Sequence, residues 1–334
     1  MEKKFLIIQT AFIGDVVLAT AVAEKLHQFY PAAGIDFMLR KGNEVLLEGH
    51  PFLRNILVWD KKKEKYGGLF RLLQRVRNEN YDHVINLQRF GATGFLTAFS
   101  GARETIGFNK NPFSFLFSKK IPHLISKPGI TSHEVDRNQL LISHLTDSIA
   151  AKPRLYPTTA AKEKVRQYKI EPYICIAPAS VWFTKQYPKE KWISFLKALP
   201  DSLTVYIIGA PSDATLADEI IREVGINRKI ISLCGSLSLI QSVALQQDAV
   251  MNYVNDSGPM HFASAVNAPV TAIYCSTVPS FGFGPLSDRK FIVETPIALE
   301  CRPCGLHGWP ACPLGHFNCA HFIQDEQLLR SISI

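Results

Sequence analysis

The sequence predicts an α/β protein made of two Rossmann-like, doubly wound parallel-sheet domains that face a central cleft. Short apolar runs typical of strands alternate with segments typical of helices through both halves of the chain. The length of 334 residues suits two domains. A polar, Pro-rich segment, Lys152–Thr158, separates the halves, so we place the domains at residues 1–155 and 156–334.

Four strands are predicted in the first half, with helices at Val16–Phe29 and Gly68–Glu79 between them. Strands that alternate with helices form a parallel sheet covered on both faces. The predicted strands are Phe5–Gln9, Ile35–Leu39, Asn55–Trp59 and Val84–Leu87.

The second half repeats this pattern. Open α/β sheets bind ligands at the carboxyl ends of their strands, so the loops that follow the strands are the candidate sites. The predicted strands are Tyr173–Ala177, Leu203–Ile208, Lys229–Ser232, Ala249–Val254 and Val270–Tyr274, and the helices are Lys189–Leu199, Ala214–Val224, Leu239–Gln247 and Pro259–Val266.

The net charge of +8 and the isoelectric point near 9.1 point to an anionic partner, such as a nucleotide, an acidic glycan, a membrane surface or a nucleic acid. Nucleic acid is disfavoured because the basic residues are spread out and no aromatic-plus-Gly binding motif is present. The first residues, Met1–Ala23, imitate a signal peptide, but Asp15 interrupts the apolar run. We therefore expect a cytoplasmic protein with reduced cysteines.

The segment Asn255–His261 joins a predicted strand to a predicted helix through a turn of small residues. Such a turn leaves backbone N–H groups unpaired at the positive end of the helix dipole, which suits phosphate. Pro259 fits the first helical turn, where its missing N–H costs nothing. Asp256 adds a carboxylate that can bind hydroxyl groups, and His261 adds a titratable imidazole. The segment is therefore predicted to bind a phosphorylated ligand.

Asp15 lies in the segment Ile13-Gly14-Asp15, at the carboxyl end of the first predicted strand. A carboxylate in this place either caps the following helix or takes a proton from a sugar hydroxyl within hydrogen-bond reach. The two roles are compatible.

The loop Ala177–Pro188 follows the first strand of the second half. Its hydroxyls at Ser180 and Thr184 and the compact charge of Lys185 suit phosphate oxygens. The alternative for Lys185 is an ordinary solvated side chain.

Two further loops follow strands in the second half. Asp213, in Gly209–Asp213, either accepts hydrogen bonds from ribose hydroxyls or caps the helix that begins at Ala214. The apolar turn Leu233–Leu237 either lines a base pocket or closes the core.

Four segments in this order resemble glycosyltransferase family 9, the ADP-heptose:lipopolysaccharide heptosyltransferases of Gram-negative bacteria. The resemblance spans nearly the whole chain, and Asp256–His261 is its most specific block. It implies a GT-B fold and an inverting transfer that needs no metal or other cofactor. The segments are Ile13–Asp15, Ala177–Pro188, Asn255–His261 and Ser276–Pro279.

The resemblance also implies roles. The first domain would bind the acceptor and the second the ADP-sugar, with Asp15 as the catalytic base. Lys185 would act as a second catalytic residue by meeting the negative charge that grows on the departing ADP. The predicted donor site comprises Ser180, Thr184, Lys185, Asp213, Leu237, Asp256, Ser257, Gly258 and His261.

The sequence departs from the family pattern in the loop after the first strand of the second half. It has Pro178-Ala179-Ser180 where the family often has Pro-Gly-Ala, and Lys185-Gln186-Tyr187-Pro188 where the family often has Lys-Arg-Trp-Pro. These departures bear on which sugar is held more than on the fold.

A run of lysines follows the third strand of the first half. Such a run usually forms a solvated face, but in the resembling family basic residues of this region meet an anionic acceptor, a Kdo-bearing lipid A core. The predicted acceptor residues are Lys61, Lys62, Lys63 and Lys65.

A second basic stretch further along the first half carries several phenylalanines. It either contacts an anionic membrane surface, as in a peripheral enzyme of the inner membrane, or forms a buried loop. The stretch contains Arg103, Lys110, Phe113, Phe115, Leu116, Phe117, Lys119 and Lys120.

Four of the seven cysteines lie within residues 301–319. A Cys-x-x-Cys pair with two more cysteines nearby is typical of a structural zinc site, and reduced thiols and disulfides are the alternatives. The segment is rich in Gly and Pro, so it would fold tightly only around such a staple. The predicted zinc ligands are Cys301, Cys304, Cys312 and Cys319, with His307, His316 and His321 nearby, and Cys175, Cys234 and Cys275 are expected in the core.

We therefore predict a glycosyltransferase that moves a heptose or related sugar from an ADP-sugar to a lipopolysaccharide inner core. A second enzymatic possibility is a GT-B relative that uses a UDP-sugar, as a transferase or an epimerase. A rival of another class is a non-catalytic, basic nucleic-acid-binding protein, which would leave the loop motifs without a role.

Overall fold

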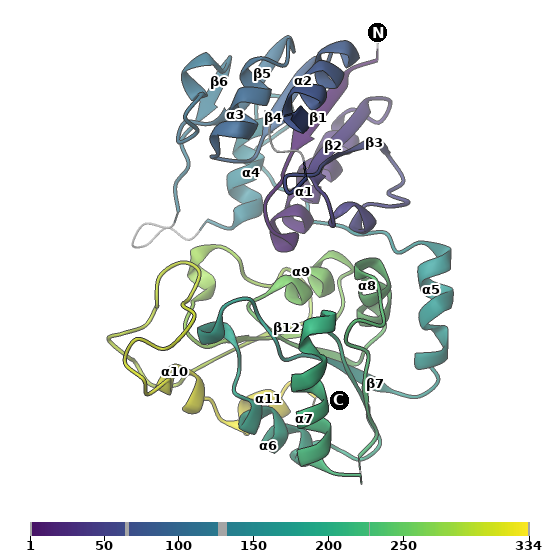
Figure 1. Cartoon of the computed structure of the whole chain (residues 1–334), viewed down its shortest axis with the longest axis vertical. Coiled ribbons are helices and arrows are strands. Elements are labelled where there is room, and N and C mark those ends of the chain that lie inside the picture. Colours follow the sequence, from purple (N-terminus) through teal and green to yellow (C-terminus); the bar gives the residue numbers. More distant parts are fainter. Residues whose placement is uncertain (1, 64–66, 126–131, 227, 333–334) are drawn as a thin grey trace. The chain divides into compact units, whose positions relative to one another are not determined.

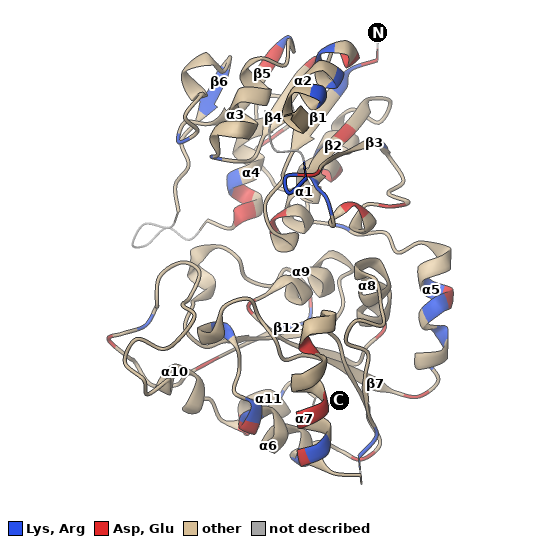
Figure 2. Ribbon diagram, in the orientation of Figure 1, with Lys and Arg blue, Asp and Glu red and all other residues tan. Residues whose placement is uncertain are grey.

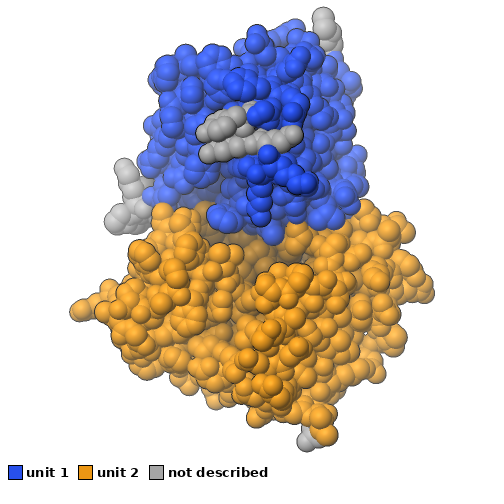
Figure 3. All heavy atoms as spheres, viewed as in Figure 1, with its two compact units in different colours: residues 1–156 blue, residues 157–334 orange. Residues whose placement is uncertain are grey.

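The computed structural model describes residues 2–63, 67–125, 132–226 and 228–332. Two compact units, Met1–Tyr156 and Pro157–Ile334, make up the chain (Figure 3). Each unit is built around its own parallel sheet of six strands, with helices packed on it (Figure 1). Among the described residues, no helix is both long and apolar enough to cross a membrane.

The sheet of the first unit has the strand order β3-β2-β1-β4-β5-β6, and every pairing is parallel. Successive strands are therefore added first on one side of β1 and then on the other, so the topology reverses between β1 and β4. The strands are β1 (Lys4–Ile8), β2 (Gly34–Arg40), β3 (Leu53–Trp59), β4 (His83–Asn86), β5 (Glu104–Phe108) and β6 (Lys119–Ile121).

Helices cover this sheet in two layers, since α1 packs against α4 while α2 packs against α3. The helix α2 is amphipathic and buries Leu69, Leu72, Leu73 and Val76 on one side. The helices are α1 (Ile13–Phe29), α2 (Gly67–Glu79), α3 (Gly91–Ala98) and α4 (Glu134–Ile142), with a short 3₁₀ turn η2 (Ser114–Leu116) before β6.

The sheet of the second unit has the order β12-β11-β10-β7-β8-β9, again parallel throughout. Its topology reverses between β7 and β10. Every residue of β7, β10 and β11 is buried, as expected for central strands covered on both faces. The strands are β7 (Tyr173–Ala177), β8 (Thr204–Ile207), β9 (Ile230–Ser232), β10 (Met251–Asn255), β11 (Val270–Tyr274) and β12 (Lys290–Glu294).

The second unit begins with α5 and ends with two short helices. Its helices are α5 (Thr159–Val165), α6 (Lys189–Ala198), α7 (Ala214–Val224), α8 (Leu239–Gln247), α9 (Gly258–Ala265), α10 (Asn318–His321) and α11 (Asp325–Leu329), with 3₁₀ turns η4 (Phe183–Lys185) and η5 (Pro211–Asp213).

The predicted α/β class and the two parallel sheets are confirmed, but the sequence analysis did not predict β5, β6 or β12. β6 and β12 are edge strands with exposed charged residues. Because these charges interrupt the apolar run that identifies a strand, neither strand could be recognised from the sequence. β5 contains Gly107, where the ring of Phe117 packs so closely that a Cβ would lie 2.5 Å from it. Glycine lowers the strand propensity of such a segment.

Candidate active-site residues of the two units

In the second unit, the loops after β7 and β10 meet at the point where the strand order reverses. Asn255, the last residue of β10, joins them. Its amide donates to the carbonyl oxygen of Pro178 at 2.8 Å, and its Oδ1 accepts from the N–H of Tyr187 at 3.0 Å. Asn255 is fully buried, so the loop that carries Ser180, Thr184 and Lys185 is fastened to the end of β10.

Lys185 and Asp256 form an ion pair at this point. The Nζ of Lys185 lies 2.6 Å from Oδ2 of Asp256, and both side chains are largely buried. Thr277, which follows β11, donates its hydroxyl to the same Oδ2 at 2.7 Å. Three neighbouring strands thus contribute one side chain each to a cluster in which a lysine is held by a carboxylate.

The helix α9 begins directly after Asp256. Its N-cap is Ser257, whose side chain makes no capping hydrogen bond and instead donates to the carbonyl oxygen of Asn255 at 3.3 Å. Pro259 occupies the first turn, and His261 is buried one turn into the helix. The predicted passage from a strand through a short turn into a helix is therefore present, and binding of an anion at its first turn stays a prediction.

Thr184 was predicted to contact the donor, but its hydroxyl already has structural partners. Its Oγ1 accepts from the hydroxyl of Ser276 at 3.0 Å and from the N–H of Trp309 at 2.8 Å. The side chain is buried, with 1% of its surface exposed. Thr184 therefore fastens residues 308–309 to the end of β11, and contact with a ligand would have to come through its neighbours.

Asp213 caps the turn η5 and not the helix that begins at Ala214, so the alternative role predicted for it is wrong in its helix, because its side chain makes no capping hydrogen bond to α7. Its Oδ2 accepts from the N–H of Ala210 at 2.8 Å, closing η5 just before α7. The N–H of Gly235 donates to the carbonyl oxygen of Gly209 at 3.0 Å, so the loops after β8 and β9 lie side by side. This brings the region of Leu237, which is half-buried, near that of Asp213.

Ser180 is half-buried in the loop after β7. Its carbonyl oxygen accepts from the side-chain amide of Gln186 at 2.7 Å, a contact that closes the loop on itself. Whether the Ser180 hydroxyl meets a donor sugar stays a prediction.

In the first unit, Asp15 lies in the first turn of α1, after the carboxyl end of β1. Its Oδ2 accepts from the N–H of Phe12 at 3.1 Å, so it caps the helix as one of its two predicted roles requires. The side chain is half-buried. The topology of this sheet reverses between β1 and β4, so Asp15 occupies the position where doubly wound sheets place ligands.

A buried ion pair lies on α4, the helix that packs against α1, and the sequence analysis did not predict it. The guanidinium of Arg137 donates to Oε2 of Glu134 at 2.8 Å and to the carbonyl oxygen of Ser132 at 2.5 Å. Burial raises the pKa of Glu134, and the negative charge of Asp15 raises it further. The positive charge of Arg137 lowers this pKa, but by less than burial raises it. The two carboxylates are therefore electrostatic neighbours, although they are more than a hundred residues apart in sequence.

The predicted acceptor lysines differ in their environments. Lys61 is half-buried, and its Nζ donates to the carbonyl oxygen of Thr10 at 3.0 Å and to the Thr10 hydroxyl at 2.8 Å. It thus fastens the loop after β1, which leads to Asp15. Lys62 and Lys63 are exposed, as a solvated face requires, and Lys65 lies outside the described residues.

The seven cysteines are free thiols in this structure. Cys175 and Cys275 are fully buried in the core, as predicted, while Cys234 is half-buried beside it. Burial raises the pKa of the Cys304 thiol. The Sγ of Cys304 donates to the carbonyl oxygen of Cys301 at 3.3 Å, and the Sγ of Cys301 lies 4.0 Å from Nε2 of His316. Among the described residues, no three His, Cys, Asp or Glu side chains are placed to hold one metal ion.

The sequence matches a known family over most of its length. Residues 69–307 match the family described as glycosyltransferase family 9 (heptosyltransferase), and the chain belongs to this family. The protein is therefore a glycosyltransferase, and the two parallel sheets are those of the GT-B fold.

Individual relatives agree with this assignment. The lipopolysaccharide heptosyltransferase 3 of Escherichia coli strain K12 is 28% identical over 282 residues, which cover 79% of this chain and 80% of the relative. Two solved structures share the fold at 20% identity: a family 9 glycosyltransferase from Veillonella parvula (TM-score 0.83, covering 98% of this chain and 95% of that one) and E. coli ADP-heptose lps heptosyltransferase II (TM-score 0.80, covering 98% and 97%).

Proposed function

We propose that this protein transfers a heptose, with inversion, from an ADP-heptose to the inner core of lipopolysaccharide at the cytoplasmic face of the inner membrane. The observation that carries the proposal is the cluster of Lys185, Asp256 and Thr277 beside the first turn of α9. The names of relatives, which include a lipopolysaccharide heptosyltransferase and a lipooligosaccharide heptosyltransferase, support the sugar and the class of acceptor.

On the donor side, the diphosphate would lie at the first turn of α9, where backbone N–H groups and the helix dipole favour negative charge. Lys185 would neutralise the charge that develops on the β-phosphate as ADP departs. Asp256 holds the ammonium of Lys185 at 2.6 Å and also presents a carboxylate that can accept from sugar hydroxyls. Asp213 and Leu237 would then border the ribose and the base.

On the acceptor side, Asp15 would act as the base. A hydroxyl oxygen of the acceptor attacks the anomeric carbon of the heptose, and its proton passes to the Asp15 carboxylate. The bond between the anomeric carbon and the phosphate oxygen breaks, and ADP leaves with the electron pair. The exposed Lys62 and Lys63 are proposed to contact acid groups of a Kdo-bearing lipid A acceptor.

Binding of nucleotides tests the donor assignment before any acceptor is needed. ADP should raise the melting temperature of the protein more than UDP or GDP at equal concentration, because a ligand that binds only the folded state stabilises it. Selective stabilisation by UDP or GDP would instead contradict the ADP-sugar assignment and favour a different nucleotide-sugar donor.

We also propose that Cys301, Cys304, Cys312 and Cys319 take up a structural zinc ion. Their thiols are the ligands that zinc prefers, and all four lie within the 19 residues from Cys301 to Cys319. Because no described group is already placed around an ion, binding would have to draw the thiols together. Elemental analysis of protein purified without chelator should give about one zinc per chain, and metal-free protein with unchanged melting temperature would contradict the proposal.

A further inference from the structure

The first unit carries a connected set of aromatic side chains on α2, on α3, directly after α3 and directly before η2. The ring of Phe95 on α3 lies 6.0 Å from that of Phe70 on α2, 4.9 Å from that of Phe99 and 6.0 Å from that of Phe113. Phe99 and Phe113 are also in contact, at 6.5 Å. We call this surface, together with Phe115 and Leu116 of η2, the aromatic face.

The aromatic face is exposed rather than covered by the rest of its unit. Phe115 exposes 73% of its surface, Phe70 60%, Leu116 45% and Phe99 44%. Exposed apolar side chains that gather in this way mark an interaction site. The alternative of a buried loop, left open by the sequence, therefore holds only for Phe117, which is buried.

The turn that carries Phe115 and Leu116 is fixed by buried neighbours. Phe117 packs over Gly107 of β5. On the other side, buried Asn111 donates to the carbonyl oxygens of Gln88 and Phe90 at 3.1 Å each. The side chains of Phe115 and Leu116 are therefore exposed on a backbone whose conformation is fixed by these contacts.

The described stretch of chain that carries the aromatic face is basic. Residues 67–125 contain eight Lys or Arg and three Asp or Glu, which is a net charge of +5. Blue segments mark this excess on α2 and β6 in Figure 2.

The three acids of this stretch are already paired. Glu79 contacts Arg54 at 2.9 Å, Asp82 contacts Arg103 at 3.3 Å, and Glu104 accepts hydrogen bonds from His83 and His144. None of these contacts involves five further cations of the stretch, which are Arg75, Arg77, Lys110, Lys119 and Lys120.

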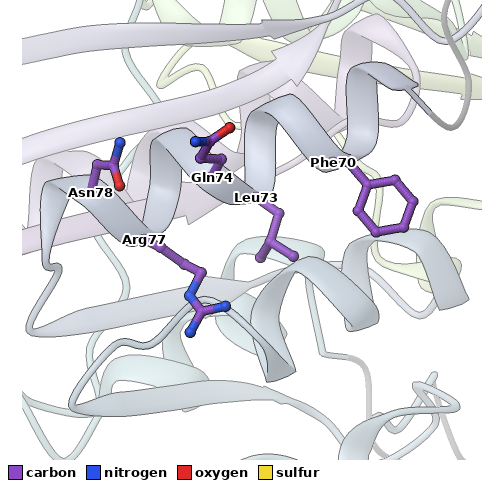
Figure 4. Close-up of a pocket in the computed structure, with 5 residues that line it drawn as sticks. All are labelled: Phe70, Leu73, Gln74, Arg77 and Asn78. Carbon is purple, nitrogen blue, oxygen red and sulfur yellow. The ribbon is translucent and has the colours of Figure 1, made fainter.

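A surface hollow on α2 combines the two kinds of side chain. It encloses about 260 Å³ and is lined by Phe70, Leu73, Gln74, Arg77 and Asn78 (Figure 4). None of the predicted catalytic or donor residues lines it. Its apolar wall next to a guanidinium matches the junction of acyl chain and phosphate in a phospholipid.

We propose that the aromatic face docks the enzyme onto a bilayer that contains anionic phospholipid. Phenylalanine and leucine side chains enter the headgroup boundary, while Lys and Arg of the same stretch meet lipid phosphates. The proposal rests on the proposed function in one respect: a transferase whose acceptor is anchored in a membrane gains by resting on that membrane.

Vesicle flotation tests this docking without donor or acceptor sugar, so its result is independent of the transferase assignment. The full-length protein is mixed with vesicles of phosphatidylcholine alone or with 30 mol % phosphatidylglycerol (about a third anionic lipid, enough for a negative surface potential). We expect flotation with the anionic vesicles only, weakened by salt because surface charges are screened.

The double variant Phe115→Glu/Leu116→Glu should lower vesicle affinity at least tenfold, because each side chain loses its transfer into the apolar boundary and gains a repelled charge. Ile149→Glu is the matched control, since Ile149 lies in the same unit, exposes 72% of its surface and is outside the aromatic face. It should bind as the wild type does. Equal melting temperatures establish that the variants fold.

Activity on a deacylated, soluble acceptor separates docking from chemistry. The double variant should turn over this acceptor at the wild-type rate and lose activity only on acceptor embedded in vesicles. Failure of the wild type to bind anionic vesicles would overturn the proposal, as would an equal loss in the Ile149→Glu control. Concentration-dependent dimerisation that Phe115→Glu/Leu116→Glu abolishes would assign the face to a second copy of this chain instead.

Discussion

The ammonium of Lys185 lies 2.6 Å from a carboxylate oxygen of Asp256, although the two residues are 71 positions apart in the sequence. The pair forms where the loops after β7 and β10 meet, and it is largely shielded from water. The ammonium also donates to the backbone carbonyl oxygen of Asp256 at 3.3 Å, so it keeps its position and retains one of its three N–H donors for a further anion. This arrangement is the core of the proposed donor site.

Lys185→Ala should lower the transfer rate about a hundredfold or more, because the charge on the departing diphosphate loses its cation. It should also destabilise the protein by about 3–5 kcal/mol, since Asp256 is left as a buried, unpaired charge. The double variant Lys185→Ala/Asp256→Asn separates these effects, because it should regain stability in denaturant titrations without regaining activity. Wild-type turnover in Lys185→Ala would remove the lysine from the mechanism.

Asp15→Asn should reduce transfer by about 10²- to 10⁴-fold, because an amide cannot accept the acceptor's proton. ADP affinity should not change, since the base belongs to the acceptor side. Asn can still accept from the N–H of Phe12, so helix capping should survive and the free energy of unfolding should change by less than about 1 kcal/mol. Calorimetry with ADP and steady-state kinetics check both points, and full turnover would refute the role.

Thr277→Val should weaken the proposed donor site while leaving the charges of Lys185 and Asp256 in place. The substitution removes the hydroxyl that donates to Asp256 at 2.7 Å and should cost about 1.5–3 kcal/mol of stability, the usual value for a hydrogen bond to a charged group. Thr277→Ser keeps the donor and is the control. If Val and Ser variants show the same stability and the same ADP affinity, the contact does not support the lysine–carboxylate pair.

His123 should make the first unit sensitive to acid. Burial lowers the pKa of His123 to about 4, and the charges of Arg89, Arg137 and Lys110 act in the same direction. The unfolded chain binds a proton near pH 6.5, whereas the folded one does so only near pH 4, so stability falls as the pH drops between these values. The loss should reach about 3 kcal/mol, and His123→Leu should reduce it; identical pH profiles of unfolding would contradict this.

Local signals predicted the two sheets and the position of most site residues. The apolar run before Asp256 and the small-residue turn after it identify a strand that passes into a helix, and Asp15 follows the first strand in the same way. These features depend on neighbours within a few residues, which is why the sequence reveals them.

The partners of the site residues depend on long-range contacts, which the sequence did not reveal. Ser276 and Thr277 were recognised as part of a motif. The sequence did not reveal that the Thr277 hydroxyl donates to Asp256, or that the Thr184 hydroxyl accepts from the backbone N–H of Trp309. The buried pair of Glu134 and Arg137 resembles an ordinary i,i+3 pair on a surface helix, so its place on the helix that packs against α1 became visible only in the fold. The ends of the strands could be located, while the partners across them could not.

The most direct test of the central claim is transfer itself. The purified protein would be incubated with ADP-heptose and a Kdo-bearing lipid A core that lacks the heptose, with the Asp15→Asn variant in parallel, and the glycan would be analysed by mass spectrometry. We predict that the acceptor gains the mass of one heptose residue, that ADP is released in equal amount, and that the variant gives almost no product. An unmodified acceptor with intact ADP-heptose, or transfer that proceeds from a UDP-sugar instead, would contradict the account.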